Sequence, residues 1–175
     1  MTVSADDRDL PRGIASGPVG PVQVNFDGAC EEIRGQRIAA YGYTLEGGGL
    51  RHEDFGLAVP PGHPRATNNV AEYLGAICAL EWLVRQGYSG PVRLAGDSQL
   101  VVRQMTGEYR VLKEHLVPYQ ERLKQLAGQF AQVDFVWVPR AENSRADELS
   151  KRGLELGVRP REARGPSVPE DDAAE

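Results

Sequence analysis

Four carboxylates constrain this chain more than any other feature, because each belongs to a separate block with its own predicted strand or helix. A fold that brings such acids together creates a small anionic pocket, where like charges repel and raise each other's pKa. One or two divalent cations would relieve that repulsion, so the pattern predicts a metal site. The four are Asp27 in VNFDGAC, Glu72 in TNNVAEYLGA, Asp97 in LAGDSQLVV and Asp147 in ENSRADELS.

The apolar pattern predicts an α/β architecture with one mixed sheet. Alternation of apolar and polar residues predicts a first strand that ends at Asp27-Gly28, and the run Glu46-Gly47-Gly48-Gly49 is typical of a hairpin turn. The segment Thr67-Asn68-Asn69 offers capping oxygens to a helix start, and Gly157 is expected to cap the last helix. The expected strands are 22–27, 38–45, 50–59, 92–95 and 133–138, and the expected helices are 67–86, 98–105, 116–127 and 144–156.

Length and composition predict one domain at residues 22–158, with disordered tails at 1–21 and 159–175. No stretch has the length of a membrane span, and the N-terminus lacks the pattern of a secretory signal. The cysteines Cys30 and Cys78 suggest no disulfide framework, so a cytoplasmic location is expected. The net charge of −5 argues mildly against a nucleic-acid binder, but many of the acids lie in the tails or among the four carboxylates.

In order and spacing, the four blocks resemble the type 1 ribonuclease H family, over roughly residues 22–156. Its members share a strand ending in D-G, a helix start T-N-N-x-x-E, a strand running into D-S-Q and a helix E-N-x-x-x-D. The matching segments here are Asp27-Gly28, Thr67 to Glu72, Asp97-Ser98-Gln99 and Glu142 to Asp147. The resemblance implies a ribonuclease H-like fold: a five-stranded mixed sheet in the order 3-2-1-4-5, with helices on both faces.

The resemblance also implies an enzyme that hydrolyses the RNA strand of RNA–DNA hybrids and leaves 5′-phosphate and 3′-hydroxyl ends. The implied cofactor is a pair of Mg²⁺ or Mn²⁺ ions, which suits hard oxygen ligands and an in-line displacement. Catalysis and metal binding are both assigned to Asp27, Glu72, Asp97 and Asp147. Asp27 is expected to bridge the two ions, Asp147 to help bind one of them, and Glu72 with Asp97 the other.

Substrate recognition is expected to use the RNA 2′-hydroxyls, which a hybrid displays in its wide minor groove. The expected partner is an RNA–DNA hybrid bound by a monomer, with no membrane involved. By resemblance, Thr67 and Asn143 match positions that hold phosphate. The full set of expected substrate-binding residues is Gly28, Thr67, Asn68, Asn69, Ser98, Gln99, Arg140 and Asn143.

Two departures place the chain with a shorter branch of the family. The loop at 138–142 has no histidine, and Arg140 is the residue there that could hold phosphate. The basic protrusion expected after Gly107 is missing.

Taken one at a time, the acids also have ordinary structural explanations. Asp97 could interact favourably with a helix dipole, and Asp147 could form an ion pair with Lys151. Two other functions stay open: a non-catalytic RNA- or hybrid-binding module on the same fold, and a related nuclease such as a junction resolvase or a 3′-exonuclease.

Overall fold

The structure, a computed structural model, describes residues 20–158. The tails predicted at 1–21 and 159–175 lie outside these residues, except for Gly20 and Pro21. Within the described part of the chain, no helix has both the length and the apolar character needed to span a membrane.

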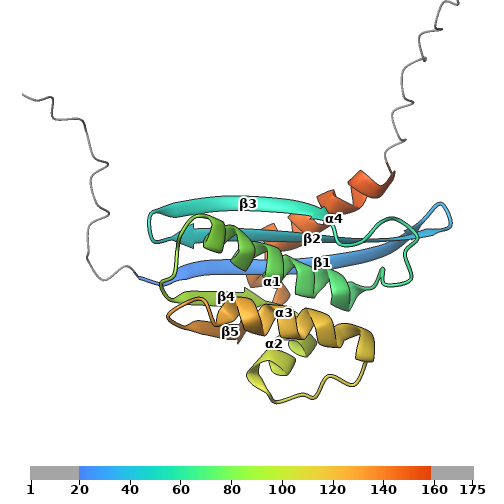
Figure 1. Cartoon of the computed structure of the whole chain (residues 1–175). Helices are drawn as coiled ribbons and strands as arrows, with labels where there is room; N and C mark the ends of the chain where they lie inside the picture. The colour runs from blue at the N-terminus through green and yellow to red at the C-terminus, as the bar shows by residue number, and fades with distance from the viewer. Residues whose placement is uncertain (1–19, 159–175) are drawn as a thin grey trace, which may run out of the picture.

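A single five-stranded sheet has the order β3-β2-β1-β4-β5, which confirms the predicted fold class (Figure 1). The first three strands pair antiparallel in sequence order, whereas β4 pairs parallel to β1, and β5 pairs parallel to β4. The order places β1 at the centre, between the antiparallel hairpins and the parallel half. The strands are β1 Val22–Ile33, β2 Gln36–Gly47, β3 Leu50–Leu57, β4 Val92–Gly96 and β5 Val133–Trp137.

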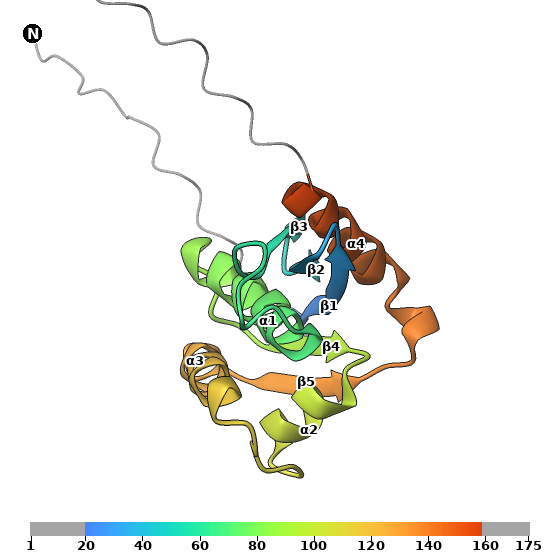
Figure 2. The ribbon, with the colours of Figure 1, turned by 90° about the vertical axis from the view of Figure 1, so that its right-hand side faces the viewer.

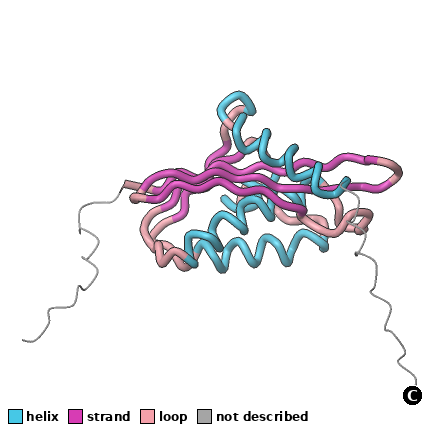
Figure 3. Tube along the Cα trace, turned by 90° about the horizontal axis from the view of Figure 1, so that it is seen from above, coloured by secondary structure: helices cyan, strands magenta, loops and turns pink. Residues whose placement is uncertain are grey.

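Helices cover both faces of the sheet, with α1 and α3 packed together on one face and α4 alone on the other (Figures 2 and 3). Two of the four helices begin at caps that the sequence signals. The hydroxyl oxygens of Thr67 and Ser98 accept hydrogen bonds of 3.2 Å from the backbone N–H groups of Val70 and Val101. The helices are α1 Asn68–Arg85, α2 Gln99–Thr106, α3 Val117–Ala127 and α4 Ser144–Val158, with 3-10 turns at Glu114–Leu116 and Arg140–Glu142.

The two faces of the sheet carry apolar cores of very different size. The large core lies under α1 and α3, with Phe26, Leu80 and Leu123 among its fully buried members. Under α4 the buried cluster is Ile38, Ala40 and Leu154, and Ala146 and Leu149 of the helix itself are also buried. This helix instead approaches the sheet closely: a side-chain carbon added at Gly42 of β2 would lie 2.5 Å from the backbone nitrogen of Ser150. Close approach at Gly42, together with the buried side chains of Leu149 and Leu154, therefore sets the position of α4 against the sheet.

Two expected boundaries are wrong. The first strand does not end at Asp27-Gly28, because its pairing with β2 continues as far as Ile33 opposite Gln36. The strand reverses instead through Arg34 and Gly35, whose positive φ values of 52° and 76° are typical of a tight two-residue hairpin turn. Likewise, Gly157 does not end α4, which continues to Val158; a side-chain carbon at Gly157 would lie 2.6 Å from Cγ2 of Ile38, so this glycine serves packing.

Candidate active site

The four predicted acids line one pocket, although they come from four different elements. Asp27 lies within β1, and Asp97 directly follows β4. Because these strands are parallel and pair Phe26 with Gly96, the two acids come next to each other at the same level of the sheet. Glu72 projects from the second turn of α1 and Asp147 from the first turn of α4, on opposite faces of the sheet. The four acids therefore lie around one pocket, as expected from the sequence.

Asp27 and Glu72 are the buried pair of the site, with exposed fractions of 6% and 8%. Burial, followed by repulsion from Asp97 and Asp147, raises the pKa of Asp27 to about 7, although hydrogen bonds from Ser150 and from the backbone of Gly28 oppose the shift. Burial also raises the pKa of Glu72 to about 7, against a hydrogen bond from Ser98 and with added repulsion from Asp27 and Asp97. Both carboxylates would be stabilised as anions by a cation in the pocket.

The pKa of Asp147 is lowered, in contrast to those of Asp27 and Glu72. Partial burial acts to raise its pKa, but Lys151 and Arg140 together outweigh this and lower it. Nζ of Lys151 lies 2.8 Å from Oδ2, and Nη2 of Arg140 lies 3.2 Å from Oδ1 of the same carboxylate. The pairing with Lys151 that the sequence allowed as an alternative is present, and it coexists with a place in the pocket. Asp147 is therefore charged at neutral pH without any further partner.

The carboxylates line the pocket, and the two buried ones accept hydrogen bonds from neighbouring side chains. Across residues 20–158, no three acidic, histidine or cysteine side chains stand close enough together to hold one ion in their present rotamers. Ser150 donates to Asp27 at 2.9 Å, and Asn68 donates to Glu72 at 3.2 Å. Repulsion between the carboxylates favours such hydrogen bonds from neighbouring residues. Shared coordination of one ion would therefore require these side chains to change rotamer.

The residues expected to contact substrate fall into two groups. Thr67 and Ser98 are helix caps, and Asn68 bonds to Glu72, so these three position the acids of their own elements. Gln99 is exposed at the start of α2, and Asn69 is half-buried in the first turn of α1. Their contact with a nucleic acid stays a prediction.

Gly28 has a packing role that the sequence did not reveal. A side-chain carbon there would overlap the backbone nitrogen of Glu72 and lie 2.6 Å from the carbonyl carbon of Ala71. Helix α1 therefore rests directly on the backbone of β1 beside Asp27. This contact fixes how closely Glu72 approaches Asp27.

Asn143 and Arg140, both expected to hold phosphate, are engaged with the acids. Asn143 is 1% exposed, and its amide donates to the Phe26 carbonyl at 2.9 Å and to Asp97 at 3.2 Å. The side chain of Arg140 is 72% exposed and forms an ion pair with Asp147. Phosphate binding by Asn143 and Arg140 stays a prediction.

Ser150 is a residue of the site that the sequence analysis does not identify. Its place three residues after Asp147, on the same face of α4, is the signal that could have indicated it.

The raised pKa of Glu72 makes stability depend on pH when no divalent cation is bound. Between about pH 4.5 and 7 the folded protein keeps a proton that the unfolded chain has released, so raising the pH destabilises the fold. Over this interval the free energy of unfolding of the wild type should fall by up to about 3 kcal/mol relative to Glu72→Gln. Urea unfolding in EDTA at several pH values measures this difference. A difference that does not change with pH would contradict the electrostatic description of the pocket.

Comparison with known proteins identifies relatives over most of the described chain. A family model described as reverse transcriptase-like matches residues 25–153. Ribonuclease HI of Halobacterium salinarum is 38% identical over 138 residues, which cover 78% of this chain and 65% of that protein. The ribonuclease H of Halorhodospira halophila is 35% identical over 153 residues, covering 78% of this chain and 94% of the relative.

A further relative is much longer than this chain. The bifunctional protein Rv2228c of Mycobacterium tuberculosis is 40% identical over 94 residues, which cover 54% of this chain but 26% of that protein, so the match spans about a quarter of its length. Among solved structures, LC11-RNase H1 in complex with an RNA/DNA hybrid superimposes with a TM-score of 0.67 at 29% identity. That superposition covers 79% of this chain and 99% of the other.

Proposed function

The chain belongs to the ribonuclease H family, and from this premise we propose that it is a metal-dependent endoribonuclease that cleaves the RNA strand of RNA–DNA hybrids. The observation that carries the proposal is the meeting of Asp27, Glu72, Asp97 and Asp147 in one pocket. The relative LC11-RNase H1, whose structure holds an RNA/DNA hybrid, supports the choice of substrate.

The acids of the pocket suit a hard divalent cation. Its four carboxylates offer only oxygen donors, which Mg²⁺ and Mn²⁺ prefer. Burial raises the pKa of Asp27 and of Glu72 to about 7, so a bound cation would favour the charged form of both groups. We propose two ions held by the four acids. When bound, they supply activation of a water molecule and stabilisation of charge on the departing oxygen.

The chain's own residues orient this chemistry. Ser150 fixes the Asp27 carboxylate, and Asn143 fixes Asp97 against the end of β4. Arg140 is exposed at the rim of the pocket, where its guanidinium can pair with a phosphate oxygen of the RNA strand. Hydrolysis forms a bond between the water oxygen and phosphorus and breaks the bond to the 3′-oxygen. The products are a 5′-phosphate and a 3′-hydroxyl.

Selection of RNA is assigned to the surface beside the pocket. Exposed Asn68 and Gln99, with half-buried Asn69, lie at the starts of α1 and α2 next to Glu72 and Asp97. Their amides can both donate to and accept from 2′-hydroxyls in the wide minor groove of a hybrid. A DNA strand lacks these hydroxyls, so the proposal requires that DNA is not cleaved.

A panel of labelled duplexes tests the function. We expect the monomeric protein to cleave the RNA strand of a hybrid in Mg²⁺ or Mn²⁺, to leave duplex DNA and duplex RNA intact, and to lose activity in EDTA. The RNA fragments should be substrates for a 5′-phosphate-dependent exonuclease. Binding without cleavage in either metal would favour a non-catalytic binding module, and cleavage of DNA would favour a different nuclease.

A further inference from the structure

A chain of side-chain hydrogen bonds runs from β4 across β1 into the candidate active site. Nη1 of Arg93 donates to Oε1 of Gln23 at 2.7 Å, and Nε2 of Gln23 donates to Oδ1 of Asn25 at 3.0 Å. Nδ2 of Asn25 then donates to Oδ1 of Asn143 at 3.0 Å. Finally, Nδ2 of Asn143 donates to the carboxylate of Asp97 at 3.2 Å. All four bonds point in the same direction, toward the carboxylate.

Both ends of this chain fix its direction. Arg93 can only donate, so Gln23 must turn its carbonyl oxygen to Arg93 and its NH₂ group to Asn25. At the other end, the carbonyl of Phe26 can only accept, so Asn143 must turn its NH₂ group toward Phe26 and Asp97. The Asn143 oxygen is then left for Asn25, which has to donate to it. None of the three amides can flip without losing a bond on both sides.

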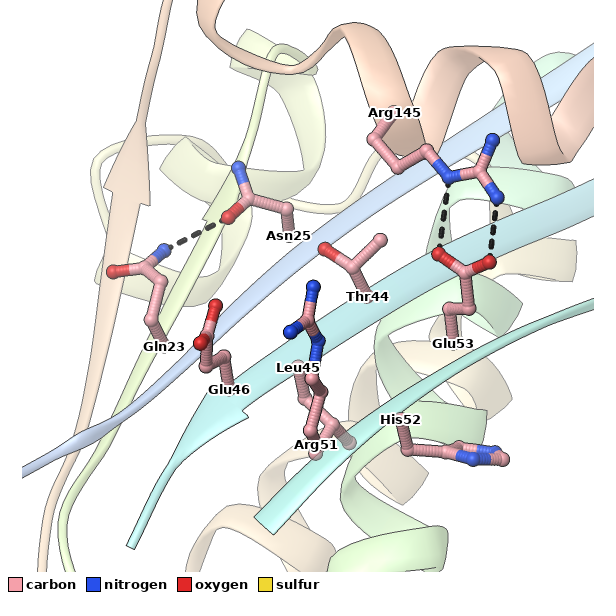
Figure 4. Close-up of a pocket in the computed structure, with 9 residues that line it drawn as sticks. All are labelled: Gln23, Asn25, Thr44, Leu45, Glu46, Arg51, His52, Glu53 and Arg145. Carbon is pink, nitrogen blue, oxygen red and sulfur yellow. Dashed lines mark hydrogen bonds and ion pairs between the residues drawn. The ribbon is translucent and has the colours of Figure 1, made fainter. Parts of the chain in front are cut away.

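This chain of hydrogen bonds lies on the sheet face that α4 leaves partly open. Figure 4 shows Gln23 and Asn25 side by side on β1, with their hydrogen bond drawn, in a pocket that also contains Thr44 of the neighbouring strand β2. Thr44 is the pairing partner of Asn25 in the β1–β2 register and takes no part in the chain of hydrogen bonds. The pair Glu53–Arg145 closes the far side of this pocket. Asn25 is thus the link between this polar surface and the buried Asn143.

We propose that Asn25 is a positioning residue, which acts through Asn143 to orient the Asp97 carboxylate for metal binding and catalysis. Asn143 has one oxygen, and Asn25 occupies it at 3.0 Å, so the amide plane of Asn143 is held from the side away from Asp97. Chains of aligned hydrogen bonds polarise one another, so the bond to Asp97 is strengthened by those behind it. The inference depends on the proposed ribonuclease function, since it assigns a role within that same site.

Replacing Asn25 tests the role. Asn25→Ala should lower kcat on a hybrid by about tenfold and weaken Mn²⁺ binding by a similar factor, at the low end of the effects seen for residues that support metal ligands. The KM for the hybrid should stay unchanged, because Asn25 is not among the residues expected to bind substrate and the side chain of Asn143 is buried. Mn²⁺ binding is read from the free-ion signal in electron paramagnetic resonance, without substrate. Thr44→Ala is the matched control, since it removes a polar side chain from the same pocket but should leave kcat and Mn²⁺ affinity at wild-type values.

Two further variants test whether the direction of the hydrogen bonds matters. Asn25→Asp keeps the shape but can only accept, so Asn143 must either lose this bond or turn its NH₂ group away from Asp97. The kcat of Asn25→Asp should therefore be no higher than that of Asn25→Ala, whereas a purely steric role would leave it near wild type. Gln23→Ala should lower kcat in the wild-type background and have no further effect in Asn25→Ala, because the chain is already broken there.

The outcomes separate this inference from the proposed function. Wild-type kcat and Mn²⁺ affinity in Asn25→Ala, or a change in KM alone, would overturn the positioning role while leaving the nuclease intact. A wild-type protein that binds Mn²⁺ but cleaves no hybrid would overturn the function. In that case unchanged Mn²⁺ affinity in Asn25→Ala would overturn the positioning role as well, and weakened affinity would uphold it for the metal site.

Discussion

Asp27→Asn is expected to lower the rate of hybrid cleavage by about a thousandfold or more, while the protein stays folded. Asp27 is the acid at the centre of the site: it is 6% exposed, and the charges of both Asp97 and Asp147 act on it. An amide keeps the shape and can still accept a hydrogen bond from Ser150, but it loses the negative charge that a divalent cation needs. Single-turnover cleavage of a labelled hybrid in saturating Mg²⁺ measures the loss.

The same substitution should make the protein more stable in the absence of divalent cations. Burial and neighbouring acids raise the pKa of Asp27 from 3.8 to about 7, so its ionisation at pH 8 opposes folding. Removing this charge should increase the free energy of unfolding at pH 8 in EDTA by about 1–4 kcal/mol. Urea unfolding measures the gain, and Asp134→Asn, which alters an acid exposed on β5, is the control for charge removal alone. An active or destabilised Asp27→Asn protein would refute the assignment of Asp27.

Gly28→Ala should damage both the fold and the activity, although it adds a single methyl group. That group would overlap the backbone of α1 at Ala71 and Glu72, and main-chain atoms cannot rotate away as a side chain can. We expect a loss of at least about 3 kcal/mol in the free energy of unfolding, the upper part of the range for overpacked sites. Because Glu72 must move away from Asp27, kcat should also fall by about a hundredfold in protein that remains folded.

Gly128→Ala provides the comparison for this experiment. Gly128 follows α3 at a φ of −65°, and an added carbon there would make only ordinary contacts, the nearest at 3.5 Å. Its stability and activity should match those of the wild type. Circular dichroism melting curves and hybrid cleavage on the two alanine variants, prepared in parallel, give the result. Equal stability of the two variants would show that α1 does not depend on the bare backbone at Gly28.

The element order and the four acids could be predicted from the sequence because both depend on local signals. Apolar periodicity located all five strands, and capping residues such as Thr67 and Ser98 marked helix starts. The sequence predicts too early an end for β1, because the Asp27-Gly28 pair has the composition of a turn, whereas the strand reverses at Arg34-Gly35. Strand pairing beyond Asp27 depends on the partner strand β2, which periodicity in β1 alone does not reveal.

The interactions that orient the acids were less accessible from the sequence. The adjacency of Asp27 and Asp97 requires the parallel pairing of β1 with β4, two strands separated by a hairpin and a helix. Family resemblance, and not apolar periodicity, indicates this pairing. The bond between Asn25 and Asn143 joins residues 118 positions apart, and no local pattern in either segment indicates it. Ser150 was within reach of helical spacing and could have been found.

The unequal cores on the two faces of the sheet bear on how this protein would lose activity on heating. Asp147 and Ser150 both lie on α4, which rests on a small apolar cluster, whereas the sheet and α1 share the large one. Detachment of α4 would expose less apolar surface than unfolding of the large core, so it costs less than dismantling the rest of the domain. Thermal inactivation should accordingly set in below the global melting temperature and be reversed on cooling, as this helix redocks on a sheet that has stayed intact.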